Sequence, residues 1–386
     1  SKTQLWAKLR GSMASTSIVI MLVALISSVA VIIYAVTSSV RSAGDQETTD
    51  FNGSRVSETL KFAVVISRHG NRGPLFNFPK SSYPVDDTKY WPYGIGQLTT
   101  VGREQMYNLG VRVRSLYNGF LDPLYYGKDF YASSTAIDRA LMSGEAFLAG
   151  LYPPTGFQVW DKDILWQPVS MYSNSPDKSQ VLNNCPRYFQ ERIQEGQAFV
   201  SDNHDNITAV LNYINEVTGS NLTSILGLYT SWDTLVTEET EGYILPEWTK
   251  NVYPQPMNDL AGKLFYSFFA ATDTICRLIM GPFMDEMLSA MKSVVNGTLT
   301  PDRKMYFYSG HDITIVTLQA ILGIPQTSII TVVPPSSGIV LELHQDPNTE
   351  KFSVQVLYID GSSPDLKLIP LVIPGCESAC SFDQIL

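Results

Sequence analysis

Residues 61–74 of this chain read KFAVVISRHGNRGP. The first part is short, rich in β-branched residues and bounded by polar ones, which predicts a buried strand over Lys61–Ser67. That strand leads into a histidine between two arginines, Arg68, His69 and Arg72. Guanidinium groups bind phosphate through planar, bidentate hydrogen bonds and stay charged at any relevant pH. Because they also disfavour a charged imidazole, the pattern predicts a neutral, nucleophilic histidine beside a phosphate site.

A second histidine motif lies far along the chain, where residues 305–312 read MYFYSGHD. The pattern predicts a strand over Met305–Tyr308 that ends close to His311 and Asp312. Ligands of α/β sheets bind beyond the carboxyl ends of the strands, so we expect both motifs to meet at one site. An alkoxide leaves phosphorus poorly unless it is protonated, which makes Asp312 the candidate general acid. His311 is the candidate for an added donor to the phosphoryl oxygens.

Further strands and helices alternate between these motifs. Residues 130–132 are predicted as a short strand, and the Ser-Ser-Thr sequence at 133–135 is predicted to cap a helix that ends near Tyr152. Arg139 falls about one turn into that helix. Two alternating stretches, at 339–343 and 352–358, are predicted to form a hairpin.

The pattern as a whole predicts an α/β fold with a three-layer core, in which helices flank a mixed β-sheet. A region of irregular, mostly helical patterns is predicted as a cap inserted into this core. The expected parts are an N-terminal lead (1–17), a membrane segment (18–36), a linker (37–57), the first part of the core (58–167), the helical cap (168–276) and the second part of the core (277–386).

Residues 18–36 read IVIMLVALISSVAVIIYAV and carry no charge. Nineteen helical residues span roughly 28 Å, close to the thickness of the hydrocarbon layer of a bilayer. Lys2, Lys8 and Arg10 precede the segment with no acid among them, which predicts a cytoplasmic N-terminus and export of the rest. The apolar run is longer than that of most signal peptides, so we expect a retained single-pass anchor, with a cleaved signal peptide as the alternative.

Other features agree with export to a lysosome, the cell surface or the surrounding fluid. Cys376 and Cys380 lie close enough in sequence to form a small disulfide, which we prefer to a metal half-site. The net charge of −10 argues against nucleic acid as a partner. Four glycosylation acceptor sequences begin at Asn52, Asn206, Asn221 and Asn296.

More motifs run through the chain in order from about residue 60. They are Trp91-Pro92 with Gly94-x-Gly96-Gln97-Leu98-Thr99, Ser134-Thr135-x-x-Asp138-Arg139, Trp166-Gln167-Pro168, Cys185-Pro186-Arg187 and Pro374-Gly375-Cys376-x-x-x-Cys380. Together with the two histidine motifs, this set resembles the histidine acid phosphatase family, most closely its animal lysosomal, prostatic and arthropod venom branch. The Arg-His-Gly tripeptide alone would also fit phosphoglycerate mutases.

The resemblance implies a role for each residue of the set: His69 as the nucleophile that becomes phosphorylated, Arg68, Arg72, Arg139 and His311 as phosphate ligands, and Asp312 as the acid that protonates the leaving group. It also implies no metal or organic cofactor, and relatives that are often homodimers. Many relatives have Arg-Ser-Thr where this chain has Ser-Ser-Thr at 133–135, so one supporting cation is absent. Cys185 and Cys276 have no evident partner.

Three functions stay open at this point. The first is a phosphatase that acts on small phosphomonoesters, or on phosphoproteins or phospholipids. The second is a specialised relative, such as a phytase, a lysophosphatidic acid phosphatase or a mutase-like enzyme. The third is an exported binding protein that has lost its activity. Loss of His69, Arg72, Arg139 or Asp312 would have favoured the third, but all four are present, so we expect the first.

Overall fold

A computed structural model describes residues 52–173 and 185–386. The predicted lead (1–17) and membrane segment (18–36) lie outside the described residues, as does most of the linker. In the part of the chain that is described, no helix is both long and apolar enough to cross a bilayer.

The predicted strand at 61–67 is β1 (Leu60–Arg68), and it lies in the middle of a mixed sheet of order β3-β2-β4-β1-β5-β6-β7. β1, β4, β2 and β3 run parallel to one another, whereas β5, β6 and β7 run antiparallel to their neighbours. The predicted hairpin is confirmed as β5 and β6. The other strands are β2 (Phe130–Ser134), β3 (Tyr172–Ser173), β4 (Met305–Gly310), β5 (Gly338–Gln345), β6 (Phe352–Ile359), β7 (Leu368–Pro370) and β8 (Cys380–Ser381), which pairs with β6.

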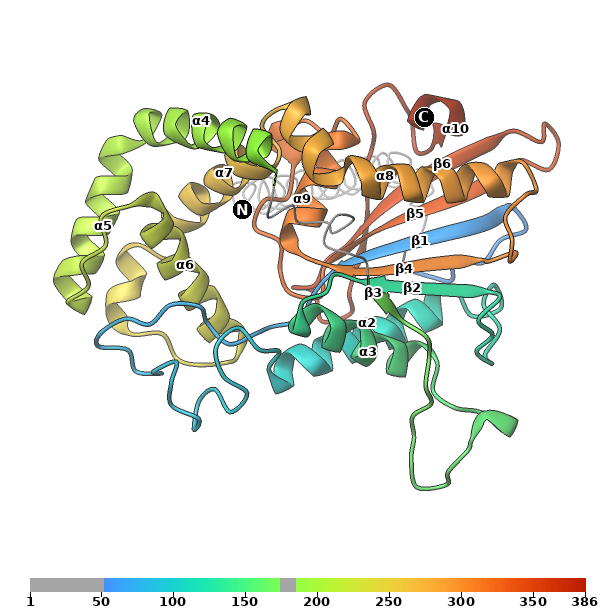
Figure 1. Ribbon diagram of the computed structural model, residues 1–386, viewed down its shortest axis with the longest axis horizontal. Helices are drawn as coiled ribbons and strands as arrows, with labels where there is room; N and C mark the ends of the chain where they lie inside the picture. Colours follow the sequence, from blue (N-terminus) through green and yellow to red (C-terminus); the bar gives the residue numbers. More distant parts are fainter. Residues whose placement is uncertain (1–51, 174–184) are drawn as a thin grey trace, which may run out of the picture. The chain divides into compact units, whose positions relative to one another are not determined.

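Helices cover both faces of this sheet (Figure 1), so the predicted mixed sheet between helices is confirmed. β1 is buried on both faces, which is why it reads as a continuous apolar run. Phe62, Val64 and Ile66 pack towards α8 and α9, while Ala63 and Val65 pack towards α2 and α3. The core helices are α2 (Thr100–Leu116), α3 (Asp138–Leu151), α8 (Asp273–Val295), α9 (Asp312–Ile321) and α10 (Phe382–Ile385).

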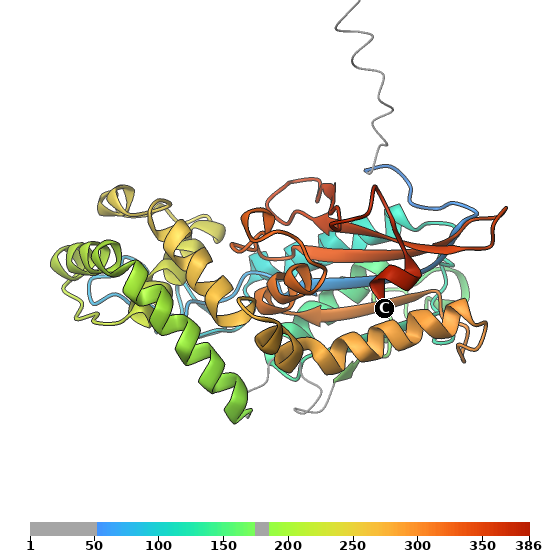
Figure 2. The same cartoon turned by 90° about the horizontal axis from the view of Figure 1, so that it is seen from above.

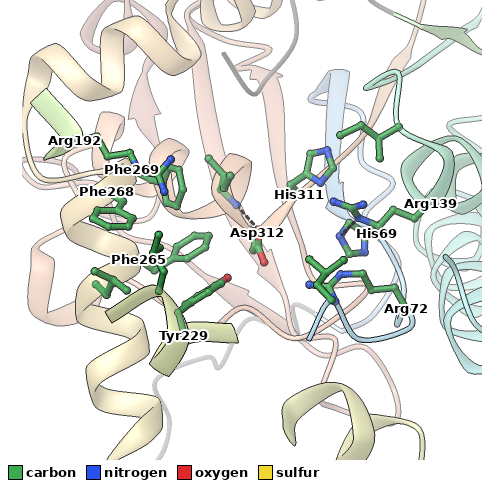
Figure 3. Close-up of a pocket in the computed structure, with 15 residues that line it drawn as sticks. His69, Arg72, Arg139, Arg192, Tyr229, Phe265, Phe268, Phe269, His311 and Asp312 are labelled. Atoms are coloured by element: carbon green, nitrogen blue, oxygen red, sulfur yellow. Dashed lines mark hydrogen bonds between the residues drawn. The ribbon is translucent and has the colours of Figure 1, made fainter. Parts of the chain in front are cut away.

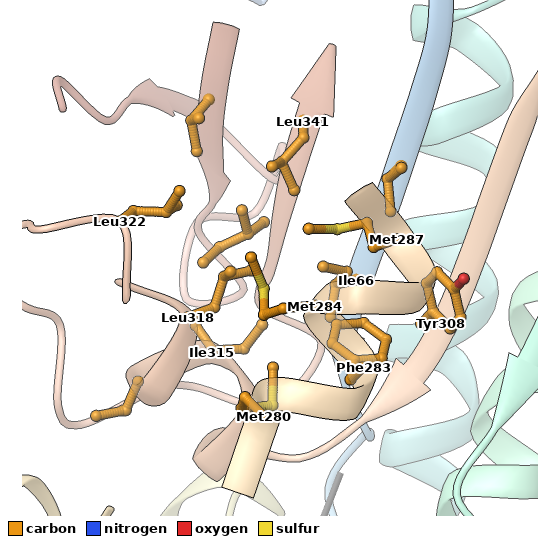
Figure 4. Packing of buried hydrophobic residues seen from close by; sticks show 14 of the residues in the cluster. Ile66, Met280, Phe283, Met284, Met287, Tyr308, Ile315, Leu318, Leu322 and Leu341 are labelled. Carbon is orange, nitrogen blue, oxygen red and sulfur yellow. The ribbon is translucent and has the colours of Figure 1, made fainter. Parts of the chain in front are cut away.

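Methionines fill much of the space between α8 and the sheet (Figure 4). Met280 and Met287 of α8 are fully buried, and Met284 between them is nearly so. They lie with Phe283 against Ile66 of β1. Methionine is unbranched and adapts to irregular gaps, so this layer fixes the position of β1 without requiring matched side-chain shapes.

A group of helices lies beyond one end of the sheet (Figure 2). These helices share a hydrophobic cluster of their own, which also takes in Phe78 from the loop between β1 and α2. The boundaries 168 and 276 that we predict for this cap stay predictions; β3 ends at Ser173 and α8 begins at Asp273. The helices are α4 (Pro186–Asp202), α5 (His204–Thr218), α6 (Ile225–Thr240) and α7 (Met257–Phe269), with short 3₁₀ turns here and elsewhere at η1 (Gly156–Gln158), η3 (Glu247–Asn251) and η4 (Gln326–Ser328).

The prediction that residues 133–135 cap a helix is wrong. The two serines belong to β2, where Ser134 pairs with Ser309 of β4, and the backbone N–H of Thr135 donates to the Ser309 carbonyl. Pairing with β4 therefore keeps this stretch extended. The helix α3 begins only at Asp138, and Ile137 at its N-cap makes no side-chain hydrogen bond.

The cysteine expectations are resolved within the described residues. Cys376 and Cys380 form the predicted disulfide, with their Cα atoms 5.2 Å apart. Cys185 and Cys276 are free thiols.

A buried polar cluster lies near the start of β1. Glu342 of β5 is fully buried and accepts hydrogen bonds from Arg55 Nε (3.0 Å) and from the Tyr117 hydroxyl (2.6 Å). His344 Nε2 lies 3.3 Å from its other carboxylate oxygen. We refer to Arg55, Tyr117, Glu342 and His344 as the Glu342 cluster.

Candidate active site

The register of the parallel strands brings the two histidine motifs together. Arg68 at the end of β1 pairs with Gly310 at the end of β4, so His69 and His311 follow neighbouring strand ends. Their rings lie edge to face with centroids 5.5 Å apart. Both histidines line a cavity of about 350 Å³ between the core and the cap (Figure 3).

His69 is held with one ring nitrogen available for attack. Nδ1 lies 2.8 Å from the Gly70 carbonyl oxygen, and because a carbonyl only accepts, Nδ1 carries the proton. Nε2 therefore has the lone pair, and it accepts a hydrogen bond of 3.0 Å from Arg139 Nε. Burial, together with the charge of Arg68 and other neighbours, lowers the pKa of His69 well below its ordinary value. His69 is thus a neutral base whose Nε2 points at a guanidinium.

Arg68 and Asp312 form an ion pair beside this nitrogen. Arg68 Nη2 lies 3.3 Å from Asp312 Oδ2, and Arg68 Nη1 donates to the Val333 carbonyl. Asp312 is the first residue of α9, and its Oδ1 accepts from the Ile313 backbone N–H at 2.9 Å. Burial alone would raise the pKa of Asp312, but Arg68, His311 and the Ile313 N–H together outweigh it, and the pKa lies below its ordinary value. Asp312 is therefore ionised in the resting site.

Arg72 is anchored by Asp233, which is not among the site residues that we predict from the sequence. Its Nη2 lies 2.8 and 3.0 Å from the two carboxylate oxygens of Asp233, which belongs to α6 of the cap and is only 5% exposed. Burial opposes the charge of Arg72, but Asp233 outweighs it and raises the pKa of the guanidinium. A sequence signal did exist, because Asp233 lies between the apolar residues Trp232 and Leu235 on the buried side of a helix, where an ionised group needs a partner.

His311 lies at the N-cap of α9 and contacts the end of β2. Its Nε2 is 2.9 Å from Thr135 Oγ1, and it forms a capping box with Thr314. Burial, with help from Arg139, lowers the pKa of His311 to about 4. Thr135, which we predicted as a helix cap, is instead a neighbour of the site.

The charges of this site do not balance. Arg68, Arg72 and Arg139 carry three positive charges against two negative charges on Asp233 and Asp312, while both histidines are neutral. The buried Nε atoms of Arg68 and Arg72 donate to no acceptor among the described residues. The catalytic end of the pocket therefore has one surplus positive charge and unused donors, which suits a multiply charged anion such as a phosphate group. No group of three His, Cys, Asp or Glu side chains is placed to hold a metal ion in the residues that the structure describes.

Two glycines set the position of the loop after β1. A Cβ on Gly70 would come within 2.1 Å of the Gly102 carbonyl oxygen, and a Cβ on Gly102 would come within 2.0 Å of the Asn71 carbonyl oxygen. The Gly70 N–H also donates to Ser143 Oγ of α3 at 3.1 Å. Gly70 therefore allows the loop after β1 to pack directly against the backbone of α2. This contact fixes the position of the neighbouring His69.

The predicted glycosylation sites lie away from this pocket. Asn206, Asn221 and Asn296 are exposed, while Asn52 is half-buried and accepts from the Leu368 N–H at 2.8 Å. Their glycosylation stays a prediction.

Comparison with known proteins identifies the family. Residues 59–359 match the histidine phosphatase superfamily (branch 2). This chain belongs to that family. Among relatives of this branch 2 histidine phosphatase, the lysosomal acid phosphatase of Rattus norvegicus is 32% identical, covering 85% of this chain and 77% of the relative. The lysosomal acid phosphatase of Xenopus laevis is 31% identical (84% and 74% covered), and the prostatic acid phosphatase of Mus musculus is 30% identical (84% of each).

Solved structures with the same fold include the phytase of Citrobacter braakii. Its TM-score is 0.63 at 18% identity, covering 85% of this chain and 96% of that one. The Hafnia alvei phytase bound to myo-inositol hexakis sulphate gives 0.60 at 19% identity (84% and 94% covered). Likeness at this identity shows the α/β fold alone. The predicted assignment to the histidine acid phosphatases, which are phosphomonoester hydrolases, is confirmed by the family match and the acid phosphatase relatives.

Proposed function

We propose that this histidine phosphatase hydrolyses phosphomonoesters through a phosphohistidine formed at Nε2 of His69. The observation that carries the proposal is the orientation of the ring. Nδ1 is tied to the Gly70 carbonyl, so the lone pair of Nε2 faces the cavity beside Arg139. The other residues of the pocket then have roles that follow from their positions.

In the first step, Nε2 attacks phosphorus and the bond between phosphorus and the ester oxygen breaks. Arg68, Arg72 and Arg139 stabilise the charge on the phosphoryl oxygens in the transition state. Arg139 gives up its hydrogen bond to Nε2 and donates to a phosphoryl oxygen instead. His311 adds a neutral donor or acceptor beside them.

Asp312 gives the leaving oxygen its proton. In the resting site Arg68 keeps this carboxyl ionised, but a bound phosphate group brings negative charge next to it and competes for Arg68. Both effects raise the pKa of Asp312, so the carboxyl takes up a proton when substrate binds. In the second step a water attacks phosphorus, the bond to Nε2 breaks, and the Asp312 carboxylate accepts the proton of the water.

The pKa values favour action in acid. Below its ordinary pKa of 6.5, an exposed histidine would become charged and lose its lone pair. The lowered pKa of His69 keeps it neutral further into the acid range, where Asp312 is more easily protonated. Activity should therefore extend well below pH 6.5 and decline as the pH rises and Asp312 can no longer hold its proton.

Residence in the secretory pathway is part of the same proposal. The relatives named as lysosomal acid phosphatases support it, and so does the disulfide between Cys376 and Cys380, a bond that persists in oxidising compartments. Attachment to a membrane through residues 18–36 and formation of a homodimer are further parts of the proposal, which rest on the sequence and on the family resemblance.

The deciding experiment is to trap the intermediate. The enzyme is mixed with a ³²P-labelled phosphomonoester, quenched during turnover and digested, and the labelled peptide is sequenced. We expect acid-labile, base-stable phosphate on His69 and none in His69→Ala. Label on a serine or aspartate, or no label during rapid hydrolysis, would contradict the proposal.

A further inference from the structure

The catalytic cavity has two chemically different ends. His69, Arg72 and Arg139 lie at one end, and the opposite wall is made of aromatic rings from the cap (Figure 3). Tyr229 of α6 contributes to this wall, together with three phenylalanines of α7. The three are Phe265, Phe268 and Phe269. The wall that faces the rest of a bound phosphomonoester is therefore mainly apolar, with Arg192 as its charged member.

A second hollow of about 600 Å³ continues from that wall over the surface of the cap. It runs between α4 and α6, and Arg192, Leu226 and Phe268 line both hollows. We refer to this second hollow as the groove; among the described residues that line it, Arg192 is the only charged one. Phe268 lies so close to α4 that a Cβ on Gly196 would meet its ring at 2.4 Å, so the ring forms the floor where the two hollows join.

The groove keeps large apolar side chains in contact with water. Phe189 and Ile193 of α4 are 40% and 57% exposed, and Leu226 of α6 is 50% exposed. A run of apolar surface of this kind, continuous with a binding pocket, indicates a ligand that covers it. Because the groove is continuous with the catalytic cavity, the group that covers it can belong to the same substrate molecule as the phosphate group.

A highly phosphorylated ring fits this surface poorly. Each additional phosphate group would need cationic partners of its own, and away from the catalytic end Arg192 is the one cation that residues 52–173 and 185–386 place along the two hollows. That guanidinium stacks on the Phe268 ring, 4.3 Å from its centroid. One cation at the junction of the hollows can bind an ester or hydroxyl oxygen, but it cannot balance several phosphates.

We propose that this enzyme takes phosphomonoesters that carry one long hydrocarbon chain, and that the groove between α4 and α6 binds the chain. The phosphate group lies at His69, the first part of the chain crosses the aromatic wall, and the rest passes Phe268 and Leu226 to reach Ile193. The inference rests on the proposed phosphatase activity and adds to it a binding site for the hydrocarbon chain of the substrate.

The test uses alkyl phosphates of increasing length with the full chain. Butyl, octyl and dodecyl phosphate are compared below their aggregation concentrations. Burial of a methylene contributes about 0.8 kcal/mol, or about fourfold, at most. Allowing for incomplete burial, we expect kcat/KM to rise roughly 100-fold from butyl to dodecyl phosphate. Dodecylphosphonate should likewise inhibit more strongly than butylphosphonate; neither compound is hydrolysed.

Two matched variants locate the chain. Ile193→Asp puts a charge in the groove, and Ile244→Asp puts one at an 85% exposed isoleucine that lines neither hollow. We expect Ile193→Asp to hydrolyse butyl phosphate normally but to lose about tenfold in kcat/KM on dodecyl phosphate, because a buried charge disfavours the chain. Ile244→Asp should behave as wild type on both.

The outcomes separate this inference from the proposed function. Hydrolysis of butyl phosphate with no dependence on chain length overturns the inference alone, as does a dependence that Ile193→Asp leaves unchanged. Failure to hydrolyse any of the three esters overturns the proposed function. The other possible occupant of the groove is a second copy of this protein. Analytical ultracentrifugation of the same variants tests it by measuring their oligomeric state. If Ile193→Asp converts a dimer to a monomer and chain length has no effect, the groove is a subunit interface.

Discussion

Two buried clusters of arginine and carboxylate lie at opposite ends of β1, and they differ in how their charges are completed. In the Glu342 cluster, one carboxylate is bonded by Arg55, Tyr117 and His344, so its oxygens are fully used. In the active site, three guanidinium groups share two carboxylates, and buried Nε atoms have no acceptor among the described residues. The Glu342 cluster therefore stabilises the fold, whereas the active site favours the binding of an anion.

The difference separates stability from function. A completed buried pair is costly to break because the remaining charge has no partner, but it offers nothing to a ligand. An incomplete cluster is costly to maintain, and a bound phosphate group reduces that cost. Changes in the two clusters should therefore affect different measurements.

The largest expected effect comes from the histidines of the two clusters. His69→Ala removes the nucleophile and should lower kcat on p-nitrophenyl phosphate by about 10⁴-fold or more. His344→Ala removes one hydrogen bond of the Glu342 cluster and should leave kcat unchanged while lowering the free energy of unfolding by about 1 kcal/mol. Steady-state kinetics and urea unfolding check both. More than 1% residual activity in His69→Ala would contradict the assignment.

Next in size is the effect of Asp312. Asp312→Asn cannot protonate a leaving group, so kcat on an alkyl phosphate should fall roughly 10²- to 10⁴-fold. The fall on p-nitrophenyl phosphate should be smaller by about one to two decades, because its leaving group needs little help. Arg139→Ala is the comparison: it should slow both substrates by similar factors. Equal losses in Asp312→Asn would remove the acid role and leave the phosphatase assignment standing.

Smaller effects are expected from Asp233 and Glu342, the carboxylates that bind Arg72 and Arg55. The first should affect phosphate binding and the second stability. Asp233→Asn loosens Arg72, so the inhibition constant of free phosphate should rise about tenfold, as expected when a binding group loses its fixed position. Glu342→Gln should leave that constant unchanged but lower the free energy of unfolding by about 3 kcal/mol. If phosphate inhibits both variants equally, Asp233 has no part in positioning Arg72.

The smallest expected effect is on pH dependence. Burial alone would raise the pKa of Glu342, but hydrogen bonds from His344, Arg55 and Tyr117 keep it below its ordinary value of 4.5. A carboxyl with a lowered pKa adds stability above about pH 4.5, and this is lost as the pH falls through its pKa in the folded state. The difference in unfolding free energy between wild type and Glu342→Gln should therefore be constant from about pH 5 to 8 and shrink below pH 4.5. A difference that shrinks near neutral pH would contradict this.

The sequence predicts what depends on local pattern. β1 reads as a strand because five consecutive residues, Phe62–Ile66, are apolar and three of them are β-branched, and the two histidine motifs could be assigned to strand ends for the same reason. Helix α7 was not predicted. Its buried residues Met257, Leu260, Leu264 and Phe265 recur at helical spacing on one face, with exposed Asp259 and Lys263 on the other, so the signal of an amphipathic helix was present in the sequence.

Long-range partners could not be predicted from local pattern. Asp233 lies 161 residues from Arg72, and nothing in the sequence around either residue indicates the other. The same holds for residues 133–135, whose composition suits a helix cap but whose conformation is set by pairing with β4. In both cases tertiary contacts decide the structure over local preference.

The contact between Gly70 and Gly102 bears on how the site can fail. Two peptide backbones meet there with no room for a methyl group, so the nucleophile is aligned by a helix residue that touches no substrate. In a random mutagenesis screen, alanine at position 102 should therefore appear among the inactive clones even though it is the mildest replacement available. Such a clone would be well expressed if the loop shifts to make room, and its defect would be one of alignment rather than of chemistry.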